Sequence, residues 1–532
     1  MSRVDADGRS SLAHSAGRLL RGYAVSGLLP RPRLFSPLEG VVTWTSPLRV
    51  VADAALEGAA RRFGADLAGA LGWEVVVDVG DADGQIVVRQ TGDLGDEGYR
   101  LQVDDVTIIE ATSAAGASYA LTTLRQLAPA IAWSSALAIV GSLDVARASC
   151  EDAPRFAWRG VHLDVARHFF DVATVMRFID LIAAHRLNRL HLHLNDDQGW
   201  RVEVPGWPRL TSVGSTRRSS PVGHERDGLD DGVFHGGFFT DDDLVSLREY
   251  AASRHVVIVP EIDLPGHAQA AIAAYPELGN TDETLEVWTR WGISEHVLNV
   301  EEATFAFAEA AVGHVADLFP ASPVHIGGDE CPTVEWENSP AAQRVMVERG
   351  LTSTRELQGL FTTRLGTLLR RRGHEVLAWD EVLDADVPDG TVIVAWREAA
   401  KGVEAARRGY DVVMAPMQSL YFDWLNSGEL AEPVAIAPAP HVTTWESVYG
   451  FEVVPARLEA ELAHHVRGAQ AQLWTEYIAT REHLDYMAFP RLCAFSEVVW
   501  GTAGDLEEFR GRLRTHLARL DAMGIAYRAL EG

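Results

Sequence analysis

Eight short apolar runs, separated by segments long enough to hold a helix, follow residue 151 of the sequence. This alternation is typical of βα units, whose strands form a parallel sheet. Eight such strands close into a (β/α)8 barrel, so we predict an α/β fold with a barrel over residues 151–532. The segment 416–468 is too long for one helix and predicts an insertion over the barrel mouth. The runs are Gly160–Val165, Arg189–Leu194, His255–Ile262, Pro323–Ile326, Glu375–Ala378, Thr391–Ala395, Asp411–Ala415 and Ala469–Leu473.

The region before residue 151 shows a different pattern. Helical periodicity covers residues 54–71 and 117–127, and several runs between them are β-branched or alternate in polarity, as strands do. We expect a small α+β domain over residues 36–150, preceded by an N-terminal extension over residues 1–35. A chain of 532 residues is long enough for a large barrel and a smaller companion domain. The clearest expected strands are Trp73–Val77, Ile86–Val88 and Tyr99–Val103.

Charge and composition restrict the partners. The chain has 47 Lys and Arg residues against 75 Asp and Glu residues, a formal net charge of −28. This charge repels nucleic acid and anionic membranes and favours a neutral or cationic substrate.

No stretch approaches the roughly 18 uninterrupted apolar residues of a membrane-spanning helix, and residues 1–35 lack the apolar core of a signal peptide. The cysteines at positions 150, 331 and 493 fit buried thiols in a reducing compartment, so we expect a cytoplasmic location.

Acidic and aromatic residues stand where the apolar runs end. The active sites of (β/α)8 barrels are assembled from these C-terminal strand ends. A single Trp at such a position more often has only a packing role, and a single Asp is often a helix N-cap. Here, however, each of the eight runs is followed by such residues. Aromatic rings pack on the apolar faces of sugars while charged groups bind their hydroxyls, so the set favours a carbohydrate substrate. The residues are Arg167 with His168, Asp196 with Asp197, Asp263 with His267, Asp329 with Glu330, Trp379, Trp396, Tyr421 with Asp423, and Trp474 with Glu476.

The most informative piece is the adjacent acid pair Asp329 and Glu330, which follows two glycines in His-Ile-Gly-Gly-Asp-Glu. Glycines let the backbone approach a ligand closely before the two acids project toward it. One acid of such a pair has to be protonated to serve as general acid, and burial next to a negative charge raises a carboxyl pKa. The longer side chain of Glu330 suits that task.

Four segments resemble the motifs of family 20 glycoside hydrolases. They are Asp164–Phe170 (DVARHFF), His191–Trp200 (HLHLNDDQGW), Pro260–His267 (PEIDLPGH) and His325–Glu330 (HIGGDE). The resemblance extends from about Phe156 to Gly524. The upstream α+β region also looks like the small domain that commonly precedes the barrel in that family.

The resemblance implies an exo-acting β-N-acetylhexosaminidase with a retaining, substrate-assisted mechanism. In this family the 2-acetamido oxygen of the substrate attacks the anomeric carbon and forms an oxazolinium ion, an exception to the two-carboxylate scheme. By motif, Asp329 would orient and stabilise the acetamide, and Glu330 would be the general acid and base. Tyr421 would donate a hydrogen bond to the acetamide oxygen.

The resemblance also implies the substrate-binding residues. A box of Trp379, Trp396 and Trp474 would enclose the acetamide methyl group. Arg167, with Asp423 and Glu476, would bind the hydroxyls at the non-reducing end, which makes the pocket exo-acting. His267 and Asp196 complete the binding set, with His267 paired through Asp196 or Asp263 to support the acid/base.

The sequence leaves two alternative functions open. His191 and His193 have the H-x-H spacing of metal-dependent barrel hydrolases, although they lie inside a strand and the tryptophan-rich rim has no task in metal-assisted hydrolysis. Activity that survives a chelator would remove this alternative, and we expect no metal and no cofactor. A non-catalytic sugar-binding protein is the second alternative, against which the intact Asp329, Glu330 and Tyr421 argue.

The sequence leaves three properties open. It does not decide between N-acetylglucosamine and N-acetylgalactosamine as the sugar released, and it does not show whether a disaccharide can be released. It also does not indicate the oligomeric state.

Overall fold

The computed structural model describes residues 27–429, 432–435 and 441–530, which pack as two compact units. The first holds residues 27–155, 184–186 and 496–530, and the second holds the described residues of 156–183 and 187–495. Residues 1–26 of the expected N-terminal extension lie outside the described residues. The boundaries expected from the sequence put the C-terminal segment with the barrel, whereas here its helix α17 (Leu506–Ala522) packs against η2 (Ala130–Trp133) of the first unit.

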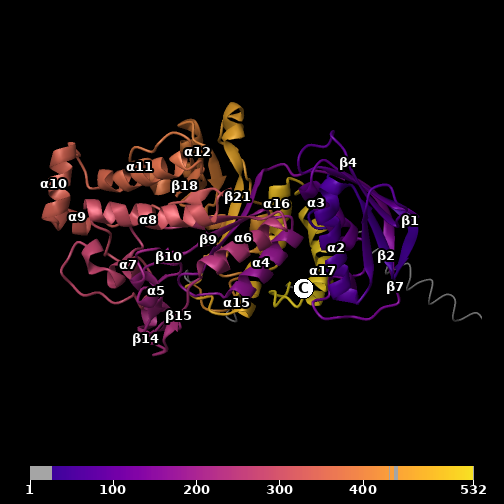
Figure 1. The fold of residues 1–532 in the computed structure, drawn as a ribbon, viewed down its shortest axis with the longest axis horizontal. Helices are drawn as coiled ribbons and strands as arrows, with labels where there is room; N and C mark the ends of the chain where they lie inside the picture. The colour runs from indigo at the N-terminus through magenta and orange to yellow at the C-terminus, as the bar shows by residue number, and fades with distance from the viewer. Residues whose placement is uncertain (1–26, 430–431, 436–440, 531–532) are drawn as a thin grey trace, which may run out of the picture. The chain divides into compact units, whose positions relative to one another are not determined.

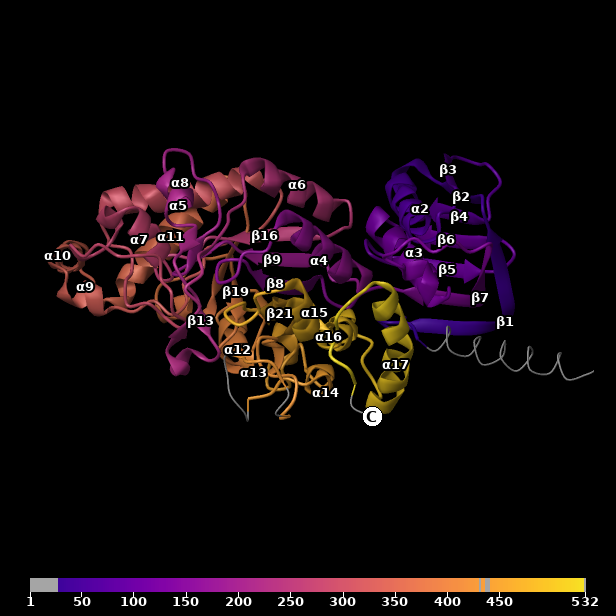
Figure 2. The ribbon, with the colours of Figure 1, turned by 90° about the horizontal axis from the view of Figure 1, so that it is seen from below.

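The first unit is an α+β sandwich of one sheet and its helices (Figure 1). The strands run in the order β1-β7-β5-β6-β4-β2-β3, with antiparallel pairs from β1 to β6 and parallel pairs from β6 to β3. Figure 2 shows α2 and α3 along one face of this sheet. The strands are β1 (Leu34–Thr45), β2 (Leu48–Ala52), β3 (Val75–Val79), β4 (Ile86–Gln90), β5 (Tyr99–Val103), β6 (Thr107–Ala111) and β7 (Ser142–Asp152).

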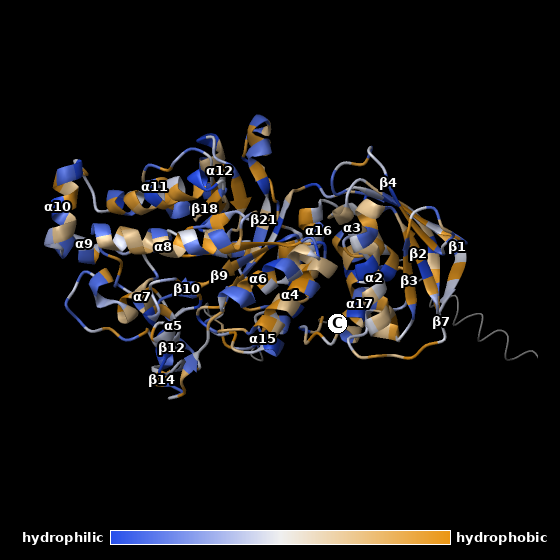
Figure 3. Ribbon diagram, in the orientation of Figure 1, coloured by the Kyte–Doolittle hydropathy of each residue, from blue (hydrophilic) through white to orange (hydrophobic). Residues whose placement is uncertain are grey.

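Local sequence signals explain the two long helices of this face. Helix α2 (Glu57–Leu71) ends at Gly72, whose φ of +68° is the left-handed conformation that favours glycine. Helix α3 (Ala114–Gln126) begins after Ser113, whose hydroxyl accepts a hydrogen bond from the Gly116 amide at 3.3 Å. Apolar side chains of both helices pack on the alternating buried positions of the strands, which appear orange in Figure 3.

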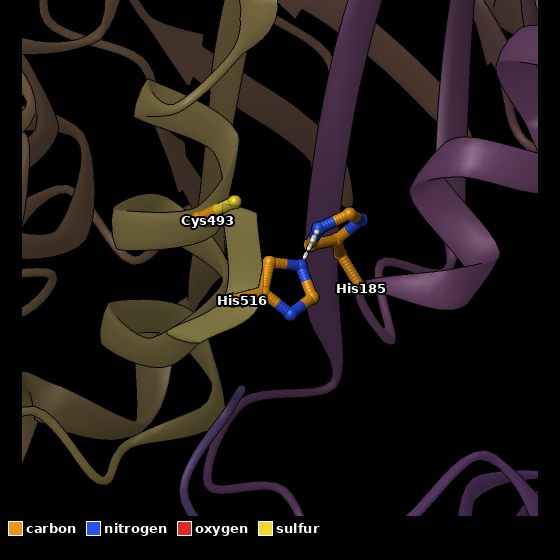
Figure 4. Close-up of side chains that lie close together, drawn as sticks. All are labelled: His185, Cys493 and His516. Atoms are coloured by element: carbon orange, nitrogen blue, oxygen red, sulfur yellow. Dashed lines mark hydrogen bonds between the residues drawn. The ribbon is translucent and has the colours of Figure 1, made fainter. Parts of the chain in front are cut away.

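Two buried histidines face each other inside the first unit. The Nε2 atoms of His185 and His516 lie 3.1 Å apart. The dashed line in Figure 4 marks this hydrogen bond. Burial, followed by the neighbouring charges of His185 and Arg519, lowers the pKa of His516 well below its usual range. The imidazole of His516 is therefore neutral in the folded unit at physiological pH.

The second unit contains the closed barrel that the eight runs predict. Its strands follow one another in the order β16-β17-β18-β19-β20-β21-β8-β9, and every neighbouring pair is parallel. Each strand overlaps the run expected for it, so this prediction is confirmed. The strands are β8 (Trp158–Asp164), β9 (Arg189–His193), β16 (Val257–Glu261), β17 (Val324–His325), β18 (Val376–Trp379), β19 (Thr391–Ala395), β20 (Val412–Met414) and β21 (Val466–Leu473).

Helices and short elements connect the barrel strands. The helices are α4 (Val172–Ala184), α5 (Arg209–Ser212), α6 (Asp241–Ala252), α7 (Gln269–Ala274), α8 (Glu302–Leu318), α9 (Val334–Asn338), α10 (Pro340–Arg349), α11 (Arg355–Arg371), α12 (Ala399–Arg407), α13 (Met417–Leu420), α14 (Trp445–Tyr449), α15 (Arg481–Ala488) and α16 (Arg491–Trp500). The β9–β16 connection carries the strand pairs β10 (Asn195–Asp196) with β11 (Gly199–Trp200), β12 (Thr216–Arg217) with β15 (His235–Gly236), and β13 (Pro221–Val222) with β14 (Leu229–Asp230). The short turns of this unit are η3 (Glu225–Asp227), η4 (Pro276–Leu278), η5 (Asp380–Asp384) and η6 (Ala460–His465), whereas η1 (Ala54–Leu56) precedes α2 in the first unit.

Two general expectations from composition can be compared with these elements. Within the described ranges no helix is both long and apolar enough to cross a membrane. Cys150, Cys331 and Cys493 are all buried and none forms a disulfide, as the sequence predicts.

Candidate active site

The barrel strands deliver the expected residues to one end of the second unit, because parallel strands of a barrel end on the same side. Arg167 follows β8, Asp196 lies in β10 directly after β9, His267 follows β16, Asp329 and Glu330 follow β17, Trp379 ends β18, Trp396 follows β19, Tyr421 and Asp423 follow α13, and Trp474 and Glu476 follow β21. Hydrogen bonds, ion pairs and ring contacts join nearly all of them into one continuous cluster. Asp423 belongs to it through its electrostatic interaction with Glu476.

The acid pair is presented by an unusual stretch of backbone. Gly327 and Gly328 have φ values of +66° and +92°, and Glu330 has a φ of +42°. A Cβ added to Gly327 would lie 1.7 Å from Oδ1 of Asp263, so only glycine fits. The same Asp263 oxygen accepts a hydrogen bond from the Gly328 amide at 2.8 Å. Strain of this kind persists where surrounding structure holds it, and it concentrates at functional sites.

Asp329 is a buried carboxyl beside a second buried carboxyl. Burial and the neighbouring Asp263 raise the pKa of Asp329 well above its usual range, while His267 opposes this. Burial likewise raises the pKa of Asp263 to about 8, against the opposing charge of His267. Among the described residues no N–H group donates to Asp329 Oδ1 or Asp263 Oδ2. With pKa values raised in this way, the two carboxyl groups hydrogen-bond to each other through a carboxyl proton. The site therefore holds a carboxyl pair to which a ligand N–H could donate.

His267 connects this pair to another acidic group. Its Nδ1 lies 3.2 Å from Asp196 Oδ1 and 3.4 Å from Asp197 Oδ2, and its Nε2 lies 3.8 Å from Asp329 and 3.7 Å from Glu330. Burial opposes a charge on the ring, but Asp196 and the other carboxyls outweigh it and raise the pKa of His267 well above its usual range. His267 also has a positive φ of +49°. A cationic His267 thus contacts both members of the acid pair.

Arg167 gathers polar groups at the other end of the cluster. Its guanidinium lies 2.8 Å from Asp196 Oδ2, 3.3 Å from Asp164 Oδ2 and 3.9 Å from Glu476 Oε1, and 5.1 Å from the centroid of the Trp474 ring. Burial and the charge of Glu476 raise the pKa of Asp423 well above its usual range, and burial raises the pKa of Glu476. Asp423 Oδ1 and Glu476 Oε2 have no hydrogen-bond donor within the described part of the chain. Fixed guanidinium donors and unoccupied carboxyl oxygens suit the binding of hydroxyl groups.

Four aromatic rings form a box beside the acid pair. The ring centroids of Trp379 and Trp474 lie 6.0 Å apart, those of Tyr421 and Trp474 lie 6.5 Å apart, and Trp396 stacks on Tyr421 at 6.1 Å. Trp379 is fully buried, whereas Trp396 is only half-buried. Burial raises the pKa of Tyr421 well above its usual range, so its hydroxyl remains a hydrogen-bond donor.

A buried network of hydrogen bonds, which no sequence motif indicates, contacts the box. Glu261 Oε1 accepts a hydrogen bond from Trp379 Nε1 at 2.8 Å, and His193 bridges Glu261 at 2.5 Å to Asp196 at 3.0 Å. Burial opposes ionisation of both groups, but their mutual attraction lowers the pKa of Glu261 well below its usual range and raises that of His193 to about 10. This buried ion pair links the aromatic box to the Asp196 carboxylate that holds Arg167. A charged residue inside an apolar run is its only sequence signal.

The same network bears on the metal-site alternative. His191 and His193 contact Glu261 at 3.1 and 2.5 Å, and His325 lies 2.9 Å from the other oxygen of this carboxylate. His162, His191 and Glu261 stand close enough to hold an ion, and so do two groups at the strand ends, Asp196 with Asp197 and His267, and Asp263 with His267 and Asp329. Glu261, however, already has a histidine or indole partner on each oxygen, and neither His191 nor His193 belongs to these two strand-end groups. The H-x-H pair therefore fits a structural role inside the barrel better than a catalytic metal centre.

Comparison with known proteins agrees with this geometry. The description "Glycosyl hydrolase family 20, catalytic domain" matches residues 156–503, and "Glycosyl hydrolase family 20, domain 2" matches residues 25–153. The chain is 38% identical to a beta-hexosaminidase of Porphyromonas gingivalis, over 82% of this chain and 55% of that protein. It is 34% identical to a beta-hexosaminidase of Vibrio furnissii, over 89% of this chain and 76% of that protein.

Solved structures lead to the same family. The crystal structure of a family 20 exo-β-N-acetylglucosaminidase from Vibrio harveyi in complex with N-acetylglucosamine superposes with a TM-score of 0.84. The two chains share 31% identity, and the match covers 95% of this chain and 78% of that one. Both regions of the protein thus match domains of one family, and the chain belongs to glycosyl hydrolase family 20.

Proposed function

We propose that this protein is an exo-β-N-acetylhexosaminidase, which removes a terminal, non-reducing β-linked N-acetylglucosamine or N-acetylgalactosamine residue from a glycan. The observation that carries the proposal is the buried carboxyl of Asp329, whose Oδ1 receives no hydrogen bond from an N–H group of the described residues, beside a box of aromatic rings. A 2-acetamido group fits this arrangement, because its N–H can donate a hydrogen bond to the carboxyl group and its methyl group can pack against the rings. Membership of the family supports the same activity.

The proposed mechanism uses the substrate's own nucleophile. The acetamide oxygen attacks the anomeric carbon, the bond to the leaving oxygen breaks, and Glu330 transfers its proton to that oxygen. The substrate binds to the ionised form of Asp329, which has released its proton to solvent. This carboxylate accepts a hydrogen bond from the acetamide N–H and stabilises the positive charge of the transition state more than the neutral ground state. Glu330 then takes a proton from the incoming water, which opens the oxazolinium ion with net retention of configuration.

The exo specificity follows from the other end of the pocket. Arg167 is held by Asp164 and Asp196, and Glu476 and Asp423 supply unoccupied carboxyl oxygens around it. These groups would bind the hydroxyls of the terminal sugar, and the arginine would close the pocket beyond them. The proposed partner is therefore a neutral carbohydrate, with no role for nucleic acid.

The decisive experiment compares chromogenic 4-nitrophenyl glycosides side by side. We expect the wild-type protein to cleave the β-N-acetylglucosaminide, the β-N-acetylgalactosaminide or both, and to cleave the 2-hydroxy β-glucoside negligibly. The ratio of the first two rates assigns the sugar, and a disaccharide glycoside tests whether the pocket accepts a second unit. A thiazoline analogue of the cyclised intermediate should inhibit competitively. Comparable rates on β-glucoside and β-N-acetylglucosaminide would refute the proposal.

A further inference from the structure

Two consecutive carboxyl side chains reach from the turn after β18 to the residue after β19. Asp380 and Glu381 open the single turn η5, and Trp396 directly follows β19. Asp380 Oδ2 accepts hydrogen bonds from the backbone amides of Trp396 at 2.8 Å and Arg397 at 3.1 Å. Glu381 Oε2 accepts a hydrogen bond from the indole Nε1 of Trp396 at 2.8 Å. One acid thus holds the backbone of this tryptophan and the other holds its ring.

The carboxyl group of Glu381 lowers the stability of the fold at this position. Its side chain is 11% exposed, and its nearest cation, Arg397 Nε, lies 3.8 Å away. Burial and the nearby Asp329 raise the pKa of Glu381 to about 8. A largely buried carboxyl with so little charge compensation destabilises the fold, so its presence here points to a task in the site.

The three tryptophans of the box are held in different ways. Trp379 is fully buried, and its indole nitrogen bonds to Glu261. Trp474 is buried under the Arg167 guanidinium. Trp396 is only half-buried and stacks on Tyr421 at 6.1 Å, so packing restricts its ring least. The indole N–H of Trp396 donates a hydrogen bond to Glu381 in addition to this stacking contact.

We propose that Glu381 is a positioning residue that fixes the indole of Trp396 and thereby sets the size of the N-acyl group that the pocket accepts. The inference rests on the proposed function, in which the tryptophan box encloses the 2-acetamido methyl group. With its ring anchored, Trp396 closes the box around a methyl group. Without the anchor, the ring turns and the box admits longer acyl chains.

The test measures acyl selectivity with 4-nitrophenyl β-glucosaminides that carry N-acetyl, N-propanoyl and N-butanoyl groups. We expect Glu381→Ala to lower the ratio of kcat/KM for N-acetyl over N-butanoyl substrate by roughly 10-fold, the size of one hydrogen bond to the ring. Glu381→Gln keeps an acceptor for the indole N–H and should stay within about 3-fold of the wild type. Asp384→Ala, which removes a 48% exposed carboxyl from the same turn and the same Arg397, should leave the ratio unchanged.

A double-mutant cycle tests the route through the ring. Trp396→Phe keeps an aromatic wall and removes the indole N–H, so it should shift the ratio itself. If Glu381 acts through that N–H, the double variant Glu381→Ala/Trp396→Phe should change the acyl ratio of kcat/KM little more than each single variant does. Unfolding midpoints at or above the wild-type value would show that the variants are folded.

Two failures are distinguishable. If the wild-type protein cleaves no N-acetyl glycoside, or cleaves 2-hydroxy glycosides equally well, the proposed function fails and this inference fails with it. If the wild type requires the acetamido group but Glu381→Ala keeps the wild-type acyl ratio, the proposed function stands and the positioning role of Glu381 is overturned.

Discussion

Asp329 and Glu330 are adjacent in the chain and lie in opposite surroundings. The side chain of Asp329 is 9% exposed and that of Glu330 is 35% exposed, although both stand close to the same nitrogen of His267. The buried acid suits a group that acts on the enclosed acetamide. The more exposed acid suits a group that exchanges protons with a leaving group and with water. The geometry thus supports the division of roles that the residue types suggest.

Glu330→Gln is expected to leave substrate binding nearly intact and to lower kcat on chitobiose by roughly 10²–10⁴-fold, the contribution of general acid catalysis. The loss should be much smaller with 4-nitrophenyl leaving groups, which need little protonation. Steady-state kinetics on both substrates measure the difference. Glu337→Gln, which removes an exposed carboxyl seven residues further on, is the control. Unchanged turnover of chitobiose in Glu330→Gln would refute the assignment.

Asp329→Ala tests whether this acid is the nucleophile. If its task is to hold and polarise the acetamide, neither azide nor another external nucleophile should rescue the variant in the manner of a missing enzyme nucleophile. A missing nucleophile would instead be replaced by azide and yield a glycosyl azide of inverted, α configuration, whereas an acetamide nucleophile permits only the β product. NMR of any azide product decides between them. Substantial α-azide would rule out the role that we assign to Asp329.

At the scale of elements, the barrel strands could be predicted because an apolar run flanked by polar turns is a local property of the sequence. The site could be predicted where its residues directly follow such runs, as Trp379 and Trp396 do. The short length of β17 could not be predicted, because it depends on the positive φ angles of Gly327 and Gly328, which follow this strand. Glu261 and His193 also escaped prediction, since nothing local in the sequence indicates which buried groups from neighbouring strands will be their partners.

Gly327→Ala tests how far the turn after β17 depends on glycine. A Cβ there would lie 1.7 Å from Oδ1 of Asp263, and the φ of +66° is itself unfavourable for alanine. Gly390→Ala is a matched control, because Gly390 has a φ of +77° and no heavy atom within 4 Å of the added Cβ. We expect the control to lose about 1 kcal/mol of stability and keep its activity, since only backbone strain is introduced.

The Gly327 variant should behave differently. Displacing Asp263 moves the hydrogen bond that positions Gly328, so activity should fall by 100-fold or more, on the order of what a 1 Å misplacement of a catalytic group costs. Unfolding midpoints and kcat/KM of both variants provide the comparison. Equal activity in the two variants would show that the clash with Asp263 has no catalytic consequence.

At the scale of the whole molecule, the sequence indicates two units, and each has its own family match. The place of the C-terminal segment could not be predicted, because its grouping with the first unit depends on contacts between residues hundreds of positions apart. Arg519, for example, donates hydrogen bonds to the backbone oxygens of Gly27 and Gln126. Periodicity along the chain gives no information on what the buried face of a helix such as α17 contacts.

The site also affects the stability of the whole chain through its buried carboxyls. Burial raises the pKa of Asp263, Asp329, Glu381, Asp423 and Glu476. An acid with a raised folded-state pKa releases its proton on unfolding, so stability falls as pH rises above the unfolded pKa of about 4 and stops falling above the folded pKa. The protein therefore holds these groups at a cost to stability at neutral pH that a simple binding surface would not need.

Asp329→Asn, which mimics the protonated acid, should accordingly be more stable than the wild type at pH 8 and close to it at pH 4. His267 keeps Asp196 and Asp197 as partners in this variant, so its charge stays compensated. We expect the unfolding midpoint at pH 8 to rise by roughly 2–4 °C, the shift that about 1 kcal/mol produces in a large domain. Thermal unfolding followed by circular dichroism at both pH values measures it, with the 48% exposed Asp384 replaced by Asn as control. Because the same substitution removes the group that we assign to the acetamide, the gain in stability should accompany a loss of activity. A variant that loses activity without gaining stability at pH 8 would show that the folded protein does not keep Asp329 protonated.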